Sequence, residues 1–219
     1  MPKQSAFEWI VEKLEGNDKV ESITVDSENL LTVIRTDGSK LTVTKTSLDS
    51  FNVSNIRSII DVQIANFILH TSKEPFVSGS VFSFLEERQI VLGGFGDLIR
   101  VVNQGKNWPY LSPEVRFIVR GLEQHTKVSA VYRLDNKRYQ IDRHELETVI
   151  IIALNDYDLS IESIRSAVDE FGQFDAILKS NPNGRITSLA VEFADSREIK
   201  VFKWGELLGK INSRWTWKK

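Results

Sequence analysis

Apolar runs alternate with amphipathic segments throughout the last third of the chain. Three short apolar runs are each followed by a segment whose apolar residues have helical spacing. The runs cover 148–154, 174–180 and 200–202, and the helical segments cover 161–171, 187–196 and 204–211. This order predicts parallel strands flanked by helices. The loops at the carboxyl ends of parallel strands share one edge of the sheet, which is where such folds bind ligands.

The start of the chain has a different pattern. Residues 5–14 have apolar positions on one helical face, and three runs with strand-like alternation follow at 20–25, 30–36 and 40–45. Asp37-Gly38 lies between the last two runs, and this dipeptide is a strong hairpin signal. The pattern predicts a small N-terminal α-β-β-β unit over residues 1–50.

The middle of the chain is predicted to be mainly helical. Helical spacing at 54–69 and 80–88 indicates a helical connector over residues 51–110, in which Gly93, Gly94 and Gly96 form a turn between helices. A helix over 111–124 and a hairpin then open a C-terminal α/β domain with a mixed sheet, over residues 111–219. The predicted class is α/β (α+β overall), and the sequence pattern shows no internal repeat.

Composition removes several kinds of chemistry. The chain has 219 residues, a formal net charge of -2 and no cysteine. Disulfides, cysteine-ligated metals and thiol catalysis are therefore excluded. No apolar run approaches the roughly 18 residues of a membrane span. We expect a cytoplasmic protein without a membrane partner. The three histidines are widely spaced, so we also expect no metal site built on them.

The parallel strands bring one set of candidate ligand-binding residues together. The set combines carboxylates, amides and cations near helix N-termini, where backbone N–H groups favour anions. Its members are Asn155, Asp156, Asp158, Asn181, Asn183, Arg185, Thr187 and Lys203. The alternative is structural, because Asn, Asp and Gly are turn residues and Thr187 is a suitable helix N-cap.

A locally basic segment supplies candidate contacts for nucleic acid. Its cations are interleaved with aromatic residues, a combination that can follow a phosphate backbone and stack bases. The candidates are Arg116, Arg120, Arg133, Lys137, Arg138 and Arg143. The alternative is a solvated helix face beside the rim of a hairpin.

The chain ends with two tryptophans, Trp215 and Trp217. Burying one large aromatic side chain stabilises a protein by about 2–3 kcal/mol. We therefore expect at least one indole to be largely buried, within its own chain rather than across a homodimer, although a homodimer contact is an open alternative.

The C-terminal half resembles the restriction-endonuclease-like fold, in particular its Mrr-like branch. The resemblance rests on residues 128–142, on the strand at 148–154 and above all on 174–211, where Thr187, Ala190, Gly205 and Leu207 match the family outline. Membership would imply a nuclease in which carboxylates and a lysine hold a divalent metal such as Mg²⁺. Asp135 or Asp142 would supply the first carboxylate. Glu198 and Lys200 have the family's Glu-x-Lys spacing, but they lie at the start of the last strand, one element later than in the family.

The strand at 148–154 carries no ionisable residue where that family needs one. We therefore expect a catalytically silent, non-enzymatic binding or regulatory protein that contacts nucleic acid or protein. The alternative is a metal-dependent nuclease or another phosphoryl-transfer enzyme whose site the sequence does not reveal.

Overall fold

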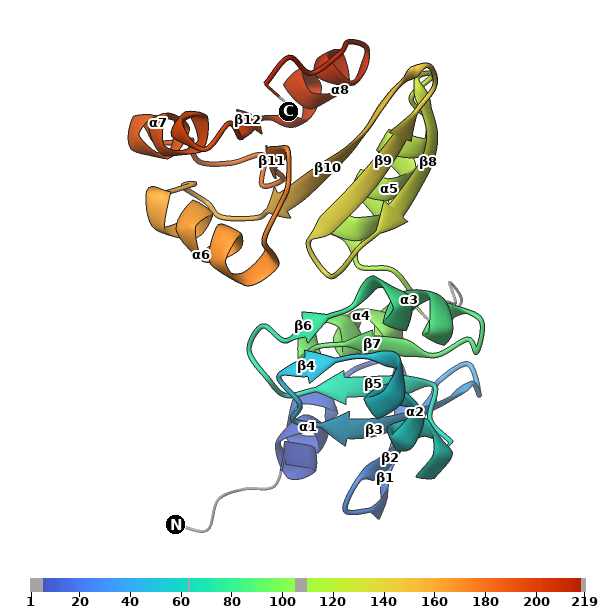
Figure 1. Cartoon of the computed structure of the whole chain (residues 1–219). Coiled ribbons are helices and arrows are strands. Elements are labelled where there is room, and N and C mark those ends of the chain that lie inside the picture. The colour runs from blue at the N-terminus through green and yellow to red at the C-terminus, as the bar shows by residue number, and fades with distance from the viewer. Residues whose placement is uncertain (1–5, 63, 105–109, 218–219) are drawn as a thin grey trace. The chain divides into compact units, whose positions relative to one another are not determined.

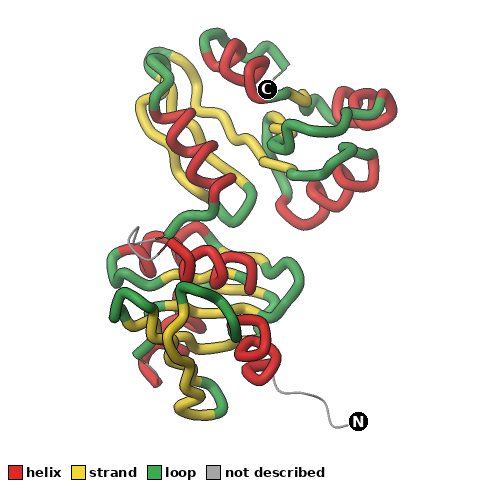
Figure 2. Tube along the Cα trace, turned by 180° about the vertical axis from the view of Figure 1, so that it is seen from behind, coloured by secondary structure: helices red, strands yellow, loops and turns green. Residues whose placement is uncertain are grey.

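The computed structural model describes residues 6–62, 64–104 and 110–217. The chain divides into two compact units, Met1–Ser112 (unit 1) and Pro113–Lys219 (unit 2). Both are mixed α/β, as the sequence predicts, and Figure 2 shows helices and strands alternating in each. None of the helices in the described ranges combines the length and apolar character that a membrane span requires.

Unit 1 is a five-stranded mixed sheet with helices on both faces (Figure 1). The sheet order is β1-β2-β3-β5-β7, formed by Val20–Ser27, Leu30–Arg35, Lys40–Thr46, Phe67–His70 and Val91–Gly93. The first two pairings are antiparallel and the last two parallel. The helices are α1 (Ala6–Leu14), α2 (Val53–Val62), α3 (Gly79–Glu86) and α4 (Phe95–Gln104), and β4 (Ser50–Phe51) pairs separately with β6 (Phe76–Val77).

Two apolar clusters hold these helices against the sheet. Phe67 and Leu69 of β5 pack with side chains of α1 and α4, whereas Ile68 packs with α2 and α3. Successive side chains of a strand point to opposite faces. A strand buried on both faces is therefore apolar at every position, as parallel sheets require.

Unit 2 repeats this architecture. Its sheet order is β12-β11-β10-β9-β8, formed by Lys200–Phe202, Ala176–Lys179, Leu146–Leu154, Arg138–Arg143 and Val128–Arg133. Its helices are α5 (Pro113–Glu123), α6 (Ile161–Phe171), α7 (Ser188–Ser196) and α8 (Trp204–Ile211). Side chains of α5 and α8 share one apolar cluster with the strands, so these two helices cover the same face of the sheet.

The two units have one topology and one strand register. In each, a helix leads into three antiparallel strands, and two helical crossovers add two parallel strands. Val33 pairs with Leu41 in unit 1, and at the equivalent place Ile141 pairs with Val149 in unit 2. The fold therefore contains an internal repeat that the sequence pattern does not show.

Local contacts repeat as well. The N–H of Gly94 donates to Asp97 Oδ2 at 3.3 Å, and at the equivalent turn the N–H of Lys203 donates to Glu206 Oε2 at 2.8 Å. A non-glycine residue with positive φ precedes the last strand of both sheets, Gln89 at 56° and Glu198 at 60°. Such backbone conformations are uncommon outside glycine, so their recurrence at one place supports an internal duplication.

Residues 51–110 do not form a separate helical connector. Their strands β5 and β7 complete the sheet of unit 1. The helix expected over 54–69 ends at Val62, and residues 67–70 form β5. Gly93 ends β7, Gly94 joins β7 to α4 and Gly96 lies within α4, so these glycines connect a strand to a helix rather than two helices. These differences share one cause, because a short apolar run has no periodicity that separates a buried strand from a helix.

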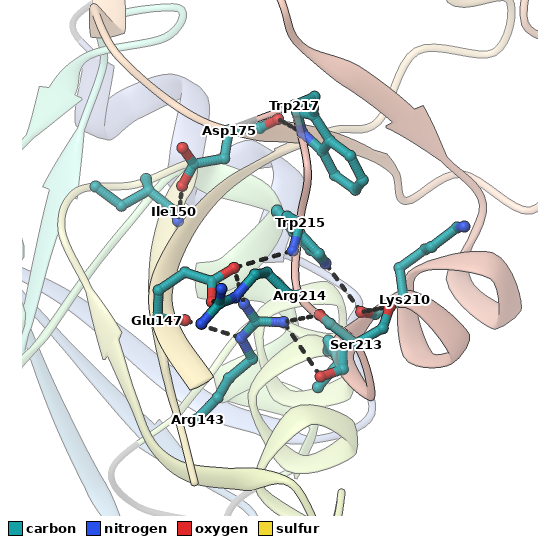
Figure 3. A network of polar contacts seen from close by, with 10 residues as sticks. Arg143, Glu147, Ile150, Asp175, Lys210, Ser213, Arg214, Trp215 and Trp217 are labelled. Atoms are coloured by element: carbon teal, nitrogen blue, oxygen red, sulfur yellow. Dashed lines mark hydrogen bonds and ion pairs between the residues drawn. The ribbon is translucent and has the colours of Figure 1, made fainter. Parts of the chain in front are cut away.

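The C-terminal tail is bound to unit 2 by a network that we call the tail clasp, formed by Arg143, Glu147 and Trp215 (Figure 3). Arg143 Nη1 donates to the carbonyls of Ile211 and Ser213, at 3.2 and 2.8 Å, and Glu147 Oε1 accepts the N–H of Trp215 at 2.9 Å. Trp215 is 2% exposed. The prediction of a buried indole within the chain is confirmed.

Burial and pairing set the charges of the clasp. Burial lowers the pKa of Arg143, while Glu147 acts against this shift. The hydrogen bond from the Trp215 backbone lowers the pKa of Glu147, and Arg143 adds to this effect. Each group thus stabilises the charged form of the other, which leaves the tail held by a charged pair rather than by apolar contact alone.

Candidate functional site

The loops after β10 and β11 come together at one edge of the sheet in unit 2. Asn181 Nδ2 donates to the carbonyl of Asn155 at 3.3 Å, and the N–H of Arg185 donates to Asp158 Oδ1 at 2.9 Å. Lys203 follows β12, which is parallel to β11, so it lies at the same end of the strands, as the N-cap residue before α8. The grouping expected from parallel strands is present.

The polar groups of this edge bond chiefly to one another. Asp156 accepts from Ser163, and the Thr187 hydroxyl caps α7 by accepting from Ala190 N–H. Lys179, which the sequence does not single out, is 3% exposed and donates to the carbonyls of Asn181 and Asn183. This pattern corresponds to the structural alternative, in which the side chains fix the loops.

Glu114 is a second residue of this edge that the sequence analysis missed. Its carboxylate accepts from Asn155 Nδ2 at 2.7 Å and from the Ser180 hydroxyl. It therefore joins the start of α5 to the loops after β10 and β11. Only its place in the first turn of a helix, where acidic residues are favoured, could have drawn attention to it.

The candidate catalytic groups have separate partners. Asp135 is fully buried and accepts from Arg138 Nε at 2.7 Å. Asp142 accepts from Thr148 Oγ1 at 2.8 Å, and Lys200 pairs with Asp195 at 2.8 Å. Within residues 6–62, 64–104 and 110–217, no group of three or more His, Asp or Glu side chains is arranged to hold a metal ion. Asp135, Asp142 and Glu198 thus form no such group.

The basic segment separates into internal and surface groups. Arg143 belongs to the tail clasp, with a side chain that is 0% exposed, and the Arg138 side chain is 20% exposed and paired with Asp135. Arg143 is therefore corrected from a nucleic-acid contact to a structural residue, because burial removes its guanidinium from any external phosphate. Arg133 and Lys137 lie partly buried on the β8–β9 hairpin, whereas Arg116 and Arg120 are exposed on α5.

Arg116 and Arg120 border a groove that only the structure reveals. It lies between α5 and α8 and has a volume of about 630 Å³. We call it the α5–α8 groove. Its lining residues are Pro113, Arg116, Phe117, Arg120, Gly121, Gln124, His125, Trp204 and Leu208. This volume is within the range of pockets that bind small molecules or the side chains of a docked peptide.

An aromatic pair forms the floor of the groove. The rings of Phe117 and Trp204 lie 4.8 Å apart at 49°, and Phe117 is 56% exposed. A Cβ at Gly121 would lie only 2.4 Å from Trp204 Cζ2, so the absence of a side chain lets the indole lie against α5. A large exposed aromatic on an apolar floor is a common mark of an interaction site.

Two arginines of α5 border this apolar floor. Arg116 and Arg120 are one helical turn apart and project from the same side of α5. At the end of α5, His125 Nε2 lies 3.1 Å from the carbonyl of Leu208 on α8, which joins the two helices. The groove thus combines an apolar base with a positive border.

Comparison with known proteins yields no relative, since no protein-family model, no curated protein and no solved structure matches the chain.

Proposed function

We propose that the chain is a non-enzymatic binding protein whose α5–α8 groove receives a helical segment of an acidic protein partner. One observation carries this proposal: Phe117, exposed and in contact with the partly buried Trp204, lies beside two arginines one turn apart. An amphipathic helix that docks in a groove inserts apolar side chains at helical spacing. Acidic side chains at the edge of such a helix would meet Arg116 and Arg120.

Charge favours a protein partner over nucleic acid. The chain has a net charge of -2, whereas nucleic-acid-binding domains commonly carry a basic excess. Among the candidate cations, Arg138 pairs with Asp135 and Arg143 pairs with Glu147, and both arginine side chains are largely or fully buried. A phosphate backbone needs a track of cations, but two arginines beside an apolar floor suit an acidic helix better.

We further propose that unit 2, and by its duplication unit 1, is a catalytically silent member of the restriction-endonuclease-like fold. The strand-helix-strand-helix order supports this proposal, as does Thr187 as the N-cap of α7, and Ala190 of α7 and Leu207 of α8 are both buried. Asp135, Asp142 and Lys200 each have a separate partner, which supports the proposed absence of catalysis.

Magnesium-dependent DNA cleavage that Asp142→Ala abolishes would favour the nuclease alternative. A cytoplasmic location is proposed from the lack of cysteine alone.

The docking proposal predicts selective binding of an acidic helix. The probe is a labelled, designed helical peptide of about 18 residues, long enough to hold helical structure, with leucines on one face and two glutamates a turn apart beside them. We expect fluorescence anisotropy to show binding at low salt. The Arg116→Glu/Arg120→Glu variant should bind at least about tenfold more weakly, since repulsion replaces attraction at two positions.

Two controls make this test specific. Arg165→Glu/Arg197→Glu changes the charge equally at exposed positions beside Phe193, outside the groove, and should leave binding unchanged. A peptide with lysines in place of the glutamates should not bind. If instead a single-stranded oligonucleotide binds and the groove variant alone loses it, the partner is nucleic acid and the proposal is wrong.

A further inference from the structure

The duplication gives unit 1 a counterpart of the groove's aromatic floor. Trp9 of α1 packs on Phe95 of α4, with ring centroids 4.4 Å apart at 55°. Phe117 and Trp204 occupy the equivalent positions in unit 2, at 4.8 Å and 49°. The two pairs exchange the indole and the phenyl ring. Trp9 is 39% exposed, so both units present an aromatic side chain on the same helical face.

At two equivalent positions beside the aromatic ring of the first helix, the two units carry charges of opposite sign, although α1 also carries Lys13 one turn after Trp9. Glu8 and Glu12 of α1 occupy the positions that Arg116 and Arg120 occupy in α5. All four residues are exposed. The two glutamates lie one helical turn apart, and so do the two arginines. Glu12 also lies 3.5 Å from Lys13, but both groups are about half exposed. Such surface pairs contribute little and do not prevent a second contact.

We propose that the α5–α8 groove binds helix α1 of a second copy of this chain. The inference rests on the proposed function and names the occupant. Helix α1 keeps its apolar face, Phe7, Ile10 and Leu14, in the core of unit 1, so what it offers the groove is one exposed aromatic ring, Trp9, with two glutamates beside it. Docking places Glu8 and Glu12 against Arg116 and Arg120, so opposite charges meet. Two acidic faces, or two basic faces, would instead repel each other.

The duplication explains why a single chain has both surfaces. A domain that associates through one face must make that face self-complementary. After duplication the two copies of the face can diverge, and opposite charges at equivalent positions make each complementary to the other. Each chain then offers one acidic helix and one basic groove, which is sufficient for self-association without another partner.

A charge exchange tests this contact. The acidic-face variant is Glu8→Arg/Glu12→Arg, and the basic-face variant is Arg116→Glu/Arg120→Glu. We expect sedimentation velocity of the full chain at low salt to show concentration-dependent association of the wild type. Each variant alone should associate at least about tenfold more weakly. An equimolar mixture of the two variants should associate again, because each acidic surface then meets a basic one.

The controls separate this contact from general charge effects and from misfolding. Asp169→Arg/Glu170→Arg makes the same charge change on an exposed part of α6 and should associate like the wild type. Recovery of association in the mixture also shows that both variants are folded. Variants that fail to associate even when mixed, with unchanged melting temperatures, would overturn the proposal.

The remaining outcomes distinguish this inference from the proposed function. A wild-type chain that is monomeric at every concentration overturns self-docking. If the acidic peptide nevertheless binds the groove, the proposed function stands and the partner is another protein. Association that neither charge variant weakens also overturns self-docking, because it must use a different surface.

Discussion

Replacing Trp215 with alanine should lower the free energy of unfolding of unit 2 by about 3–5 kcal/mol, the usual cost of removing a buried large aromatic side chain. Trp215 is 2% exposed, stacks on Trp217 at 4.9 Å and donates from Nε1 to the carbonyl of Lys210 at 2.9 Å. The substitution leaves a cavity in the tail clasp and removes the cation–π partner of Arg143.

Hydrogen exchange measures this effect separately in the two units. Amides of β10 and β11 should lose protection, whereas those of β3 and β5 in unit 1 should not. Phe117→Ala is a suitable control, because Phe117 is 56% exposed and its removal should cost much less. Unchanged protection in β10 after Trp215→Ala would show that the tail contributes nothing to the stability of unit 2.

Gly184→Ala should destabilise the loop edge of unit 2 by more than backbone conformation alone explains. Gly184 has a φ of +73°, and a Cβ there would lie 1.8 Å from the carbonyl oxygen of Tyr157. That oxygen is a backbone atom of the neighbouring loop, so it cannot move away through a change of side-chain rotamer. A positive φ alone costs a non-glycine residue about 1–3 kcal/mol, and the collision adds to this.

Gly172→Ala provides a control without a collision. Gly172 has nearly the same φ, +71°, with a ψ of -131° that lies outside the left-handed helical region, and nothing lies within 4 Å of a Cβ placed there. Urea denaturation should therefore show about 1–3 kcal/mol of destabilisation for Gly172→Ala, from backbone conformation alone, and a larger loss for Gly184→Ala, where the collision adds to that cost. Equal effects would mean that the loops after β10 and β11 separate easily, contrary to the packing of the edge.

The sequence predicted the parallel part of unit 2 because its strands and helices have clear periods and ends. Thr187 caps α7 as expected, and β10, β11 and β12 follow in the expected order. In unit 1 the same elements were missed, since Phe67, Ile68 and Leu69 form a run that continues the preceding helical pattern. The contacts that make this run a strand come from β3 and β7, which are distant in sequence.

The duplication leaves no repeated sequence motif, because equivalent positions keep the same burial more often than the same residue type. Val43 and Ile151 pair alike and are both fully buried, and Leu31 and Tyr139 also occupy equivalent buried positions. A core constrains volume and apolar character, so exchanges between large apolar residues are tolerated. Ile10 and Ile118 remain identical, but such positions are scattered along the chain.

The candidate site was predicted only in part. Arg116 and Arg120 were singled out from charge, and both border the groove. Phe117 and Trp204 were not, because the α5–α8 groove joins the first and last helices of unit 2. A sequence pattern describes one segment at a time, and nothing in α5 indicates that the indole of Trp204 lies on Gly121.

Site-specific cross-linking tests most directly whether the groove receives helix α1 of another copy. The chain has no cysteine, so an introduced cysteine is the only thiol present. Lys13→Cys marks α1 and Gln124→Cys marks the groove, and both substitutions keep the two glutamates and the two arginines. A short bismaleimide should join these variants into a covalent heterodimer at low salt, and Arg116→Glu/Arg120→Glu added to the second should abolish it. A yield no higher than that from Glu170→Cys paired with Gln124→Cys would contradict docking of α1 in the groove.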